Sequence, residues 1–203
     1  MAVRAVVFDI GGVLELTPDL GVRERWEQRL GLQPGELEAR ARGVWEAGAV
    51  GAISEREVHR RVGDLLGLDE PRVDAFMRDL WTEYLGTLNV ELADYCRGLR
   101  PRYRTAIISN SFVGARSREQ ERYHFDQITD LIVYSHEVGM SKPDPRIYRL
   151  ACARLGVRPA ETVFVDDNEL MVDGARAVGI QAVLFEDNAQ AIAAIEDRLR
   201  AAP

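Results

Sequence analysis

The sequence predicts an α/β fold in which a doubly wound parallel sheet is interrupted by an inserted helical block. After Asn89, short apolar runs of strand length alternate with stretches of helical spacing, as in a parallel sheet with crossover helices. Residues 17–87 instead show only helical spacing. Because one apolar run of strand length precedes them, the insertion should follow the first strand directly.

The first strand is predicted over residues 5–8 (AVVF), which end at Asp9 and a Gly-Gly turn pair. Within the insertion, apolar residues recur at helical spacing, and Gly or Pro residues separate the stretches. Ser54 and Glu57 indicate a capping box, with the serine as N-cap and the glutamate reaching back. We expect helices, and no convincing strand, over residues 20–30, 37–45, 55–66 and 72–85.

The remainder of the chain alternates between the two element types. Strands are predicted over residues 105–109, 131–134, 162–165 and 182–185. Helices are predicted over residues 90–99, 114–123, 145–155, 170–178 and 189–200. The simplest organisation is an α/β core made of residues 1–16 and 88–203, with residues 17–87 forming a helical cap domain.

Composition narrows the class of partner. The net charge of −7 disfavours a nucleic-acid partner, because phosphate-backbone binding needs a clustered positive face. No stretch has the length of a membrane span, and the first apolar run is too short for a signal peptide. Cys96 and Cys152 lack metal-ligand spacing, as expected of free thiols in a reducing compartment. We therefore expect a cytoplasmic protein with no nucleic-acid or membrane partner, and its oligomeric state is left open.

One basic residue differs from all the others. Of the 26 Lys and Arg residues, 25 are arginine and one is Lys142. Ammonium is a compact point charge, whereas guanidinium is a wide planar fork, so a single retained lysine suits a tight site beside a carboxylate and a small anion. Taken alone, this lysine has an alternative explanation: it could have been retained by chance on a solvent-exposed loop.

Polar side chains follow the predicted strands where a ligand is expected. In an open parallel sheet, ligands bind at the carboxyl ends of the strands. These ends and the following loops carry Asp9, Ser109 with Asn110, Lys142, and the pair Asp166 and Asp167. Carboxylates hold a hard cation such as Mg²⁺, and a lysine and a hydroxyl complement phosphate oxygens. The set therefore predicts a magnesium-assisted phosphoryl site.

Four segments, in chain order, resemble the motifs of the haloacid dehalogenase superfamily. They are FDIGGVL at residues 8–14, IISNS at 107–111, KPDP at 142–145, and VFVDDN at 163–168 followed by DGARAVG at 173–179. The insertion resembles the small helical cap of one large subgroup, and the Gly-Gly-Val version is similar to glucose-1-phosphate phosphatases and to the N-terminal domain of epoxide hydrolases. The resemblance implies a Rossmann-like core and a phosphatase acting on a small phosphorylated metabolite.

The resemblance also implies residue roles. Asp9 would be the nucleophile that forms an aspartyl-phosphate, and splitting the transfer through a covalent carboxylate is a general strategy. Lys142 would neutralise charge between this nucleophile and the transferring group. Ser109, with Asn110 beside it, would hold phosphate oxygens.

A magnesium site is implied in the same way. Its ligands would be Asp9, Asp167 and the backbone carbonyl of Gly11, with Asp166 alongside, directly or through water. The metal would let Asp9 approach an anionic phosphate without prohibitive repulsion.

The chain departs from the superfamily pattern at Gly11. Most phosphatases of the superfamily carry a second aspartate there, which protonates the leaving oxygen, and such a group contributes about 10²–10⁴-fold. Three explanations stay open: a leaving group that needs little protonation, a substitute group, or slow or absent turnover. An ordered water is one possible substitute, and the residues that could take the role are Glu15, Thr17 and Asp19.

Two other functions are kept as alternatives. A 2-haloacid dehalogenase would use Asp9 against carbon without a metal, but clustering Asp166 and Asp167 around the nucleophile gains nothing in such a site. A catalytically silent binding or regulatory member is the second, supported by the missing general acid alone. The joint presence of Asp9, Ser109, Lys142 and Asp167 speaks against decay of the site.

Overall fold

The computed structural model describes residues 2–201, and its core is a parallel sheet in the order β5-β4-β1-β6-β7. The strands are β1 (Ala5–Phe8), β4 (Arg104–Ser109), β5 (Leu131–Tyr134), β6 (Thr162–Asp166) and β7 (Gln181–Leu184). Every neighbouring pair in this sheet is parallel. The first strand lies at the centre, and the chain winds first to one side and then to the other, so the predicted doubly wound α/β fold is confirmed.

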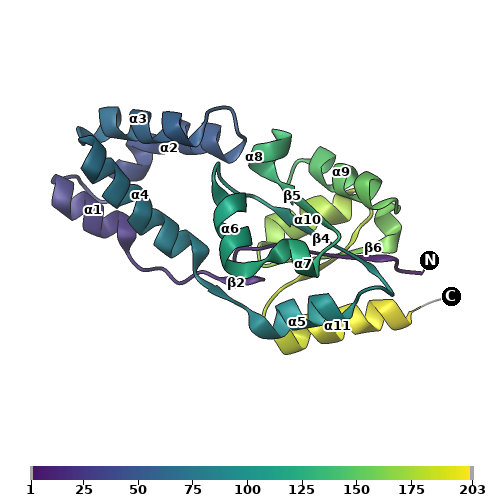
Figure 1. Cartoon of the computed structure of the whole chain (residues 1–203). Coiled ribbons are helices and arrows are strands. Elements are labelled where there is room, and N and C mark those ends of the chain that lie inside the picture. The colour runs from purple at the N-terminus through teal and green to yellow at the C-terminus, as the bar shows by residue number, and fades with distance from the viewer. Residues whose placement is uncertain (1, 202–203) are drawn as a thin grey trace.

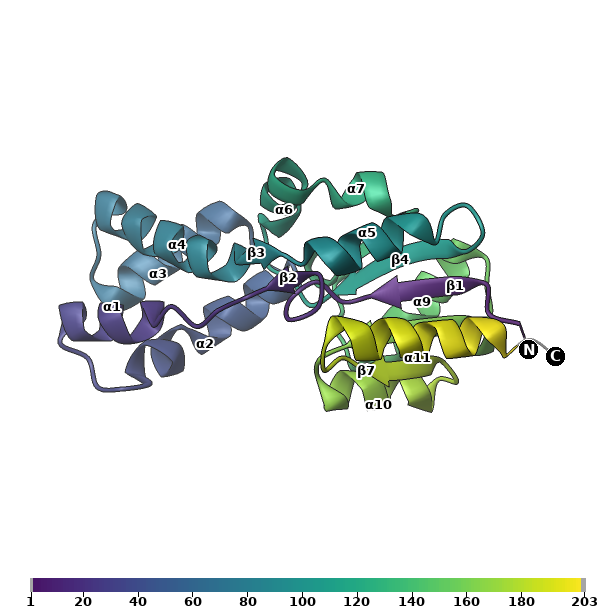
Figure 2. The ribbon, with the colours of Figure 1, turned by 90° about the horizontal axis from the view of Figure 1, so that it is seen from below.

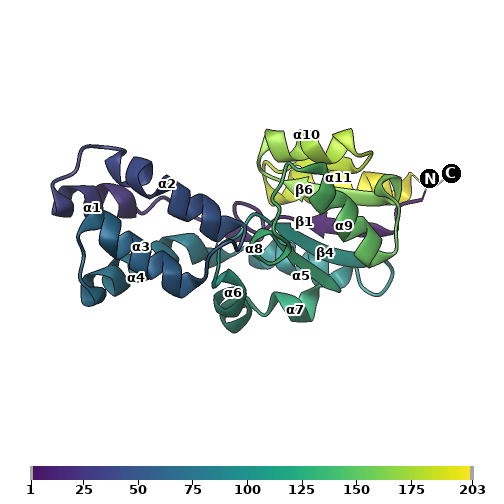
Figure 3. The ribbon, with the colours of Figure 1, turned by 90° about the horizontal axis from the view of Figure 1, so that it is seen from above.

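Helices cover both faces of this sheet, which is why the middle of each strand is apolar. Side chains of β1 alternate: Val6 and Phe8 belong to one buried apolar cluster, and Ala5 and Val7 belong to the other. The first cluster lies under α5 (Val90–Gly98) and α11 (Asn188–Arg200), seen in front of the sheet in Figure 2. The second lies under α9 (Pro145–Leu155) and α10 (Glu169–Ala177), seen in Figure 3.

The insertion forms its own helical lobe beside the sheet (Figure 1). Its helices are α1 (Val22–Leu30), α2 (Glu36–Ala49), α3 (Glu55–Leu66) and α4 (Glu70–Leu85). They enclose a separate apolar cluster that includes Trp26, Val62 and Phe76. The division into a core of residues 1–16 and 88–203 and a cap of residues 17–87 remains our proposal.

The capping box at α3 is only half formed. The Ser54 hydroxyl accepts a hydrogen bond from the backbone N–H of Glu57 at 3.3 Å, as expected of an N-cap. The Glu57 carboxylate does not reach back; it binds the guanidinium groups of Arg60 and Arg61. An exposed carboxylate gains more from two nearby cations than from one neutral backbone donor.

A short two-stranded ribbon joins the core to the insertion, and the sequence did not predict it. Strand β2 (Glu15–Leu16) pairs antiparallel with β3 (Thr87–Leu88) where the insertion leaves and rejoins the core. Gly86 precedes β3 with a φ of +52°, and a Cβ there would lie 2.3 Å from the Leu16 carbonyl oxygen. Two-residue strands carry no alternation to detect. The fold also contains α6 (Ala115–Tyr123), which the sequence predicted. The sequence did not predict three shorter elements: the helical segments α7 (Phe125–Ile128) and α8 (Ser135–Val138) and the 3₁₀ turn η1 (Pro159–Glu161).

The end of α2 is docked directly on the core. The carbonyl of Gly48 accepts from the Val113 backbone N–H at 3.2 Å, and that of Ala49 accepts from the Ser135 hydroxyl at 2.7 Å. Carbonyls at a helix C-terminus lack intrahelical partners, so the core provides them. This contact holds the helical lobe near the carboxyl ends of β4 and β5. Over residues 2–201, no helix combines the length and apolarity needed to cross a membrane.

Candidate active site

Three carboxylates meet at the carboxyl ends of the two central strands. Asp9 follows β1, Asp166 ends β6, and Asp167 comes next in the chain. Because β1 and β6 are neighbours with Phe8 opposite Val165, the first two side chains emerge side by side. Carboxylate oxygens of all three residues lie within 4.8 Å of one another. The sequence-predicted acidic residues are therefore brought together.

Lys142 lies between two of these carboxylates. Its Nζ is 2.8 Å from Asp9 Oδ1 and 2.6 Å from Asp166 Oδ2, and the residue is only 2% exposed. A buried cation is stable when such anionic partners and hydrogen bonds replace water. The compact ammonium satisfies both carboxylates at once, which agrees with the retention of a single lysine at this position.

Asn110 fixes the loop that carries Lys142. The Asn110 side-chain amide donates to the Lys142 carbonyl at 2.9 Å, while the Lys142 backbone N–H donates to Asn110 Oδ1 at 2.7 Å. This reciprocal pair joins the end of β4 to a loop 32 residues further along the chain. Both ends of the amide are engaged, so Asn110 positions Lys142; its expected contact with phosphate stays a prediction.

Asp9 has one occupied and one free carboxylate oxygen. Oδ1 accepts from the Ile10 backbone N–H at 2.7 Å and from Lys142. Within residues 2–201, no protein donor is bound to Oδ2. Burial raises the pKa of Asp9 to about 7, Lys142 opposes that rise, and Asp166 adds to it. Lys142 thus favours the ionised form that a nucleophile requires, against the larger effect of burial.

The turn after β1 brings Asp167 close to Asp9. Gly12 has a φ of +74°, and a Cβ on it would lie 2.0 Å from Asp167 Oδ2, so only glycine leaves room for this carboxylate. Burial and the neighbouring Asp166 raise the pKa of Asp167. Clustered carboxylates of this kind are a donor set that fits a hard divalent cation. Asp9, Asp166 and Asp167 therefore fit Mg²⁺, and the Gly11 carbonyl lies in the same turn.

Ser109 and Gly11 occupy the expected edge with different exposure. Ser109 is the last residue of β4, beside β1, and is 2% exposed. Gly11 is exposed and does not have a positive φ, so its backbone conformation would accept a side chain. A Cβ added to it would have no other atom within 4 Å. The space that a general-acid side chain would occupy is thus open.

The three residues considered as substitutes for the missing acid lie in different surroundings. Thr17 lines the cavity described below, and Asp19 is exposed and accepts from the Gly21 backbone N–H at 2.8 Å. Glu15 is 1% exposed, and burial followed by the charge of Glu119 raises its pKa to about 9. Glu15 is therefore a neutral buried acid.

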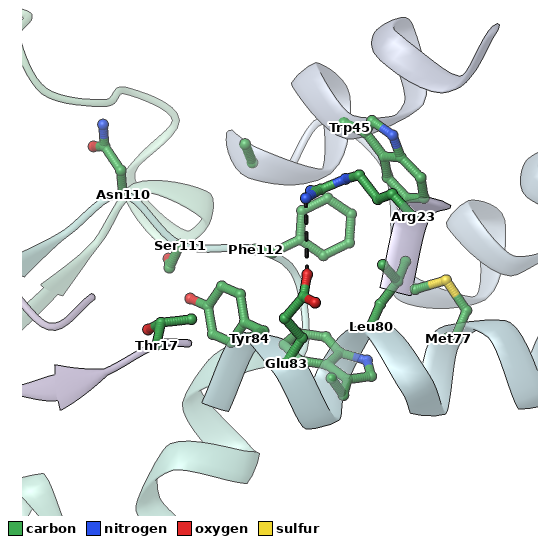
Figure 4. Close-up of a pocket in the computed structure, with 12 residues that line it drawn as sticks. Thr17, Arg23, Trp45, Met77, Leu80, Glu83, Tyr84, Asn110, Ser111 and Phe112 are labelled. Carbon is green, nitrogen blue, oxygen red and sulfur yellow. Dashed lines mark ion pairs between the residues drawn. The ribbon is translucent and has the colours of Figure 1, made fainter. Parts of the chain in front are cut away.

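A cavity of about 360 Å³ lies between the helical lobe and the core (Figure 4). On the core side it begins at Asn110 and Ser111, directly after β4, and on the other side it is lined by α2 and α4. Trp45 and Trp81 line it and contact Phe112, with ring centroids 5.9 and 6.2 Å away. The sequence offered no signal for Phe112 or Tyr84.

His136 contacts a residue of this cavity's lining. Its Nδ1 lies 2.6 Å from the Ser111 hydroxyl. Burial lowers the pKa of His136, which favours the neutral ring at pH 7. The pair orients the Ser111 hydroxyl at the core end of the cavity.

Comparison with known proteins agrees with this architecture. The family model described as haloacid dehalogenase-like hydrolase matches residues 3–179. A D-ribitol-5-phosphate phosphatase from Bacteroides thetaiotaomicron is 24% identical, over 92% of this chain and 94% of its own length. Bifunctional epoxide hydrolase 2 from Sus scrofa is 27% identical over 97% of this chain, which spans 39% of that longer protein.

A solved structure shows the same fold. It is a HAD family enzyme from Bacteroides thetaiotaomicron in complex with magnesium and inorganic phosphate. Its TM-score is 0.79 at 21% identity, with 94% of this chain and 99% of that chain covered. The whole described architecture, core and insertion together, therefore has a counterpart of known structure.

Proposed function

The chain belongs to the haloacid dehalogenase-like hydrolases, and on that premise we propose that it is a magnesium-dependent phosphatase acting on a small phosphorylated metabolite. The observation that carries this proposal is the Asp9 carboxylate, with a free Oδ2, surrounded by Lys142 and two further carboxylates. The name of the ribitol-phosphate phosphatase relative and the magnesium and phosphate of the similar structure support it. The two buried free cysteines suit a reducing cytoplasm, which we propose as its location.

Asp9 is the proposed nucleophile. Its Oδ1 is held by the Ile10 N–H and Lys142, so the carboxylate cannot rotate freely and Oδ2 stays directed away from those donors. Attack by Oδ2 on phosphorus forms an aspartyl-phosphate as the bond to the leaving oxygen breaks. Water then attacks this phosphorus, releasing phosphate and restoring Asp9.

Lys142 and Ser109 are the proposed phosphate partners. The ammonium lies between two carboxylates and offsets the charge that builds on the phosphoryl oxygens. Asp166 holds this ammonium through Oδ2, while its Oδ1 accepts from the Asn168 backbone N–H at 2.9 Å. The lysine is thus pre-positioned from both sides.

The magnesium ligands we propose are Asp9, Asp166, Asp167 and the Gly11 backbone carbonyl. When bound, Mg²⁺ would supply positive charge that lets a phosphate dianion approach the Asp9 carboxylate. Asp167 is exposed and therefore accessible to an incoming ion, whereas Asp166 is fully buried and already bound to Lys142.

The test is phosphate release from 4-nitrophenyl phosphate with Mg²⁺, with and without a chelator. We expect Asp9→Asn to lose activity by several orders of magnitude, because the amide is not a nucleophile. Asp197→Asn is the matched control, since Asp197 is an exposed residue of α11 that pairs only with Arg200. Full activity in Asp9→Asn would overturn the proposed mechanism.

The same assay separates the alternatives. A 2-haloacid dehalogenase would release halide from 2-chloropropionate regardless of chelator, and the three clustered carboxylates disfavour that metal-free chemistry. A silent binding member would release neither phosphate nor halide. Chelator-sensitive phosphate release that depends on Asp9 excludes both.

A further inference from the structure

The cavity beside the active site is walled mainly by apolar and aromatic side chains. Met77, Leu80 and Trp81 come from α4, Trp45 comes from α2, and Phe112 comes from the core loop after β4. Figure 4 shows Met77, Leu80 and Phe112 gathered at the end away from Asn110. An apolar cavity of about 150 Å³ already holds a benzene ring, so about 360 Å³ has room for a substituted ring.

Two polar groups at the core end of this lining are already bound to the protein. Both ends of the Asn110 amide bind the Lys142 backbone, and the Ser111 hydroxyl is paired with His136. The buried indole N–H groups of Trp45 and Trp81 have no hydrogen-bond partner among residues 2–201. A polyol lying against Met77, Leu80 and Phe112 would lose its water without finding partners in those side chains, which costs binding energy.

The charged groups of the lining are also paired with each other. Arg23 lies 3.9 Å from one carboxylate oxygen of Glu83, and the other oxygen accepts from the backbone N–H groups of Leu20 and Val22. Figure 4 shows this ion pair beside Phe112. The cavity therefore offers shape and apolar contact more than hydrogen bonds.

The chemistry at Gly11 points independently to the same kind of substrate. Without a general acid, the leaving oxygen must depart as an anion or take its proton from water. A phenol has a pKa near that of tyrosine, about 10, whereas an alkyl alcohol is far less acidic. A phenoxide therefore leaves without the protonation that an alkoxide requires.

We propose that the substrates are aryl phosphates, in which the phosphate is esterified to a phenolic ring that binds in the cavity against the wall formed by Trp45, Trp81 and Phe112. This assignment rests on the proposed phosphatase function and specifies its substrate class. In the first step the Asp9 Oδ2–phosphorus bond forms and the phosphorus–aryl oxygen bond breaks, so the phenoxide leaves with the electron pair and is protonated by solvent. In the second step water oxygen bonds to phosphorus, the Asp9 bond breaks, and the water protons pass to solvent and phosphate.

The test compares substrates that separate ring binding from leaving-group acidity. Phenyl phosphate has both features, benzyl phosphate keeps the ring on an alkyl oxygen, acetyl phosphate keeps the easy leaving group without a ring, and ribitol 5-phosphate has neither. We expect kcat/KM to be highest for phenyl phosphate. Benzyl phosphate should share its low KM but have a kcat lower by about 10²-fold or more.

Two variants address the two arguments separately. Leu80→Asn places a polar group in the cavity and should raise KM for phenyl phosphate about tenfold, and by a much smaller factor for acetyl phosphate, which has no ring to place there. Leu65→Asn is its control, because Leu65 is an exposed leucine of α3 outside the cavity lining. Gly11→Asp enters open space and should raise kcat for benzyl phosphate more than for phenyl phosphate.

Binding is measured without turnover by tryptophan fluorescence with phenylphosphonate, because Trp45 and Trp81 line the cavity. Saturable quenching that weakens in Leu80→Asn supports the assignment. A higher kcat/KM for ribitol 5-phosphate than for phenyl phosphate would overturn the aryl assignment, as would an unchanged KM for phenyl phosphate in Leu80→Asn. Either result leaves the phosphatase proposal standing. Absence of Asp9-dependent hydrolysis on every substrate removes the phosphatase proposal and this inference with it.

Discussion

At the scale of single residues, Lys142 is the position where side-chain shape matters most. Its ammonium contacts Asp9 and Asp166 at 2.8 and 2.6 Å in a site with almost no solvent. Asn110 holds the backbone of the same residue, so the side chain cannot retreat. A planar guanidinium is wider and needs its donors satisfied over a larger area.

We therefore expect Lys142→Arg to lower kcat on 4-nitrophenyl phosphate by about 10²-fold or more, although the charge is retained. Activity should fall because the wider guanidinium displaces the Asp9 and Asp166 carboxylates, although its positive charge still attracts them. The melting temperature should therefore fall as well. Arg200→Lys, at an exposed ion pair with Asp197, is the control that should change neither property. Wild-type turnover in Lys142→Arg would show that charge alone matters.

A second residue-scale feature is the buried acid Glu15. Its Oε1 is buried and, among residues 2–201, has no hydrogen-bond partner. Burial and Glu119 raise its pKa from 4.5 to about 9, while Arg122 opposes them and Asp9 adds to the rise. At pH 7 the folded protein thus holds a proton that the unfolded chain releases, so stability falls as pH rises from about 4.5 to 9.

Glu15→Gln keeps the shape and removes this titration. At pH 7 the variant should be more stable than the parent by up to about 3 kcal/mol, and the difference should shrink to about 0.4 kcal/mol near pH 4.5, where the unfolded carboxyl is half protonated and the folded one is fully protonated. Denaturant unfolding at pH 4.5, 7 and 8.5 measures it. A stability difference that is constant over this range would show that Glu15 is ionised in the folded state.

At the scale of elements, the contact between α2 and the loop after β4 decides how the helical lobe sits on the core. Phe112 reaches from the core toward α2, where Gly48 leaves room for its ring: a Cβ there would lie 2.3 Å from the ring. The Gly48 carbonyl also binds the Val113 N–H. One small residue thus permits both the backbone contact and the aromatic contact.

Two glycines of α2 allow a matched comparison. Gly43→Ala meets nothing within 4 Å and should stabilise the protein by about 1 kcal/mol through helix propensity. Gly48→Ala gains the same propensity but must displace Phe112, so it should be less stable than Gly43→Ala and should raise KM for phenyl phosphate. Equal melting temperatures and equal KM values would mean that Phe112 adjusts freely.

At the scale of the whole molecule, the site assembles from segments that are distant in the chain. Asp9, Asp166 and Asp167 repel one another when ionised, and burial raises the pKa values of Asp9 and Asp167. A bound divalent cation would relieve this repulsion only where the carboxylates are ionised. Metal binding should therefore stabilise the entire fold, with a pH dependence set by these groups.

We expect 100-fold Mg²⁺ over its dissociation constant to add about 2.7 kcal/mol of stability and raise the melting temperature by several degrees. Because raised carboxyl pKa values mean protonated ligands at low pH, the rise should be large at pH 8 and small at pH 5. Asp167→Asn should abolish it, whereas Asp64→Asn, an exposed residue of α3, should not. A Mg²⁺ effect of the same size in Asp167→Asn would place the ion elsewhere.

The sequence by itself determined the α/β class, the strands of the sheet, the helices of the insertion, and the edge at which Asp9, Ser109, Lys142 and Asp166 gather. Those features follow from local information: periodicity marks long elements, and a parallel sheet brings its strand ends to one edge. Asp9, Ser109 and Asp166 were found because each directly follows or ends a predicted strand, whereas Lys142 was found because it is the one lysine among 26 basic residues and lies in a loop expected at that edge.

Only the tertiary structure decided the remaining features. Each of these features depends on residues that are far apart in the chain. They are the β2–β3 ribbon, the hydrogen bonds between Asn110 and the Lys142 backbone, the burial of Glu15, and the cavity lined by Phe112. Two-residue strands show no period, and the direction of a side chain depends on packing that no local pattern encodes. The type and length of an element depend on residues that are neighbours in the chain, so the sequence predicts them. The shape of the cavity depends on how the helical lobe and the core, which pack separately, contact each other.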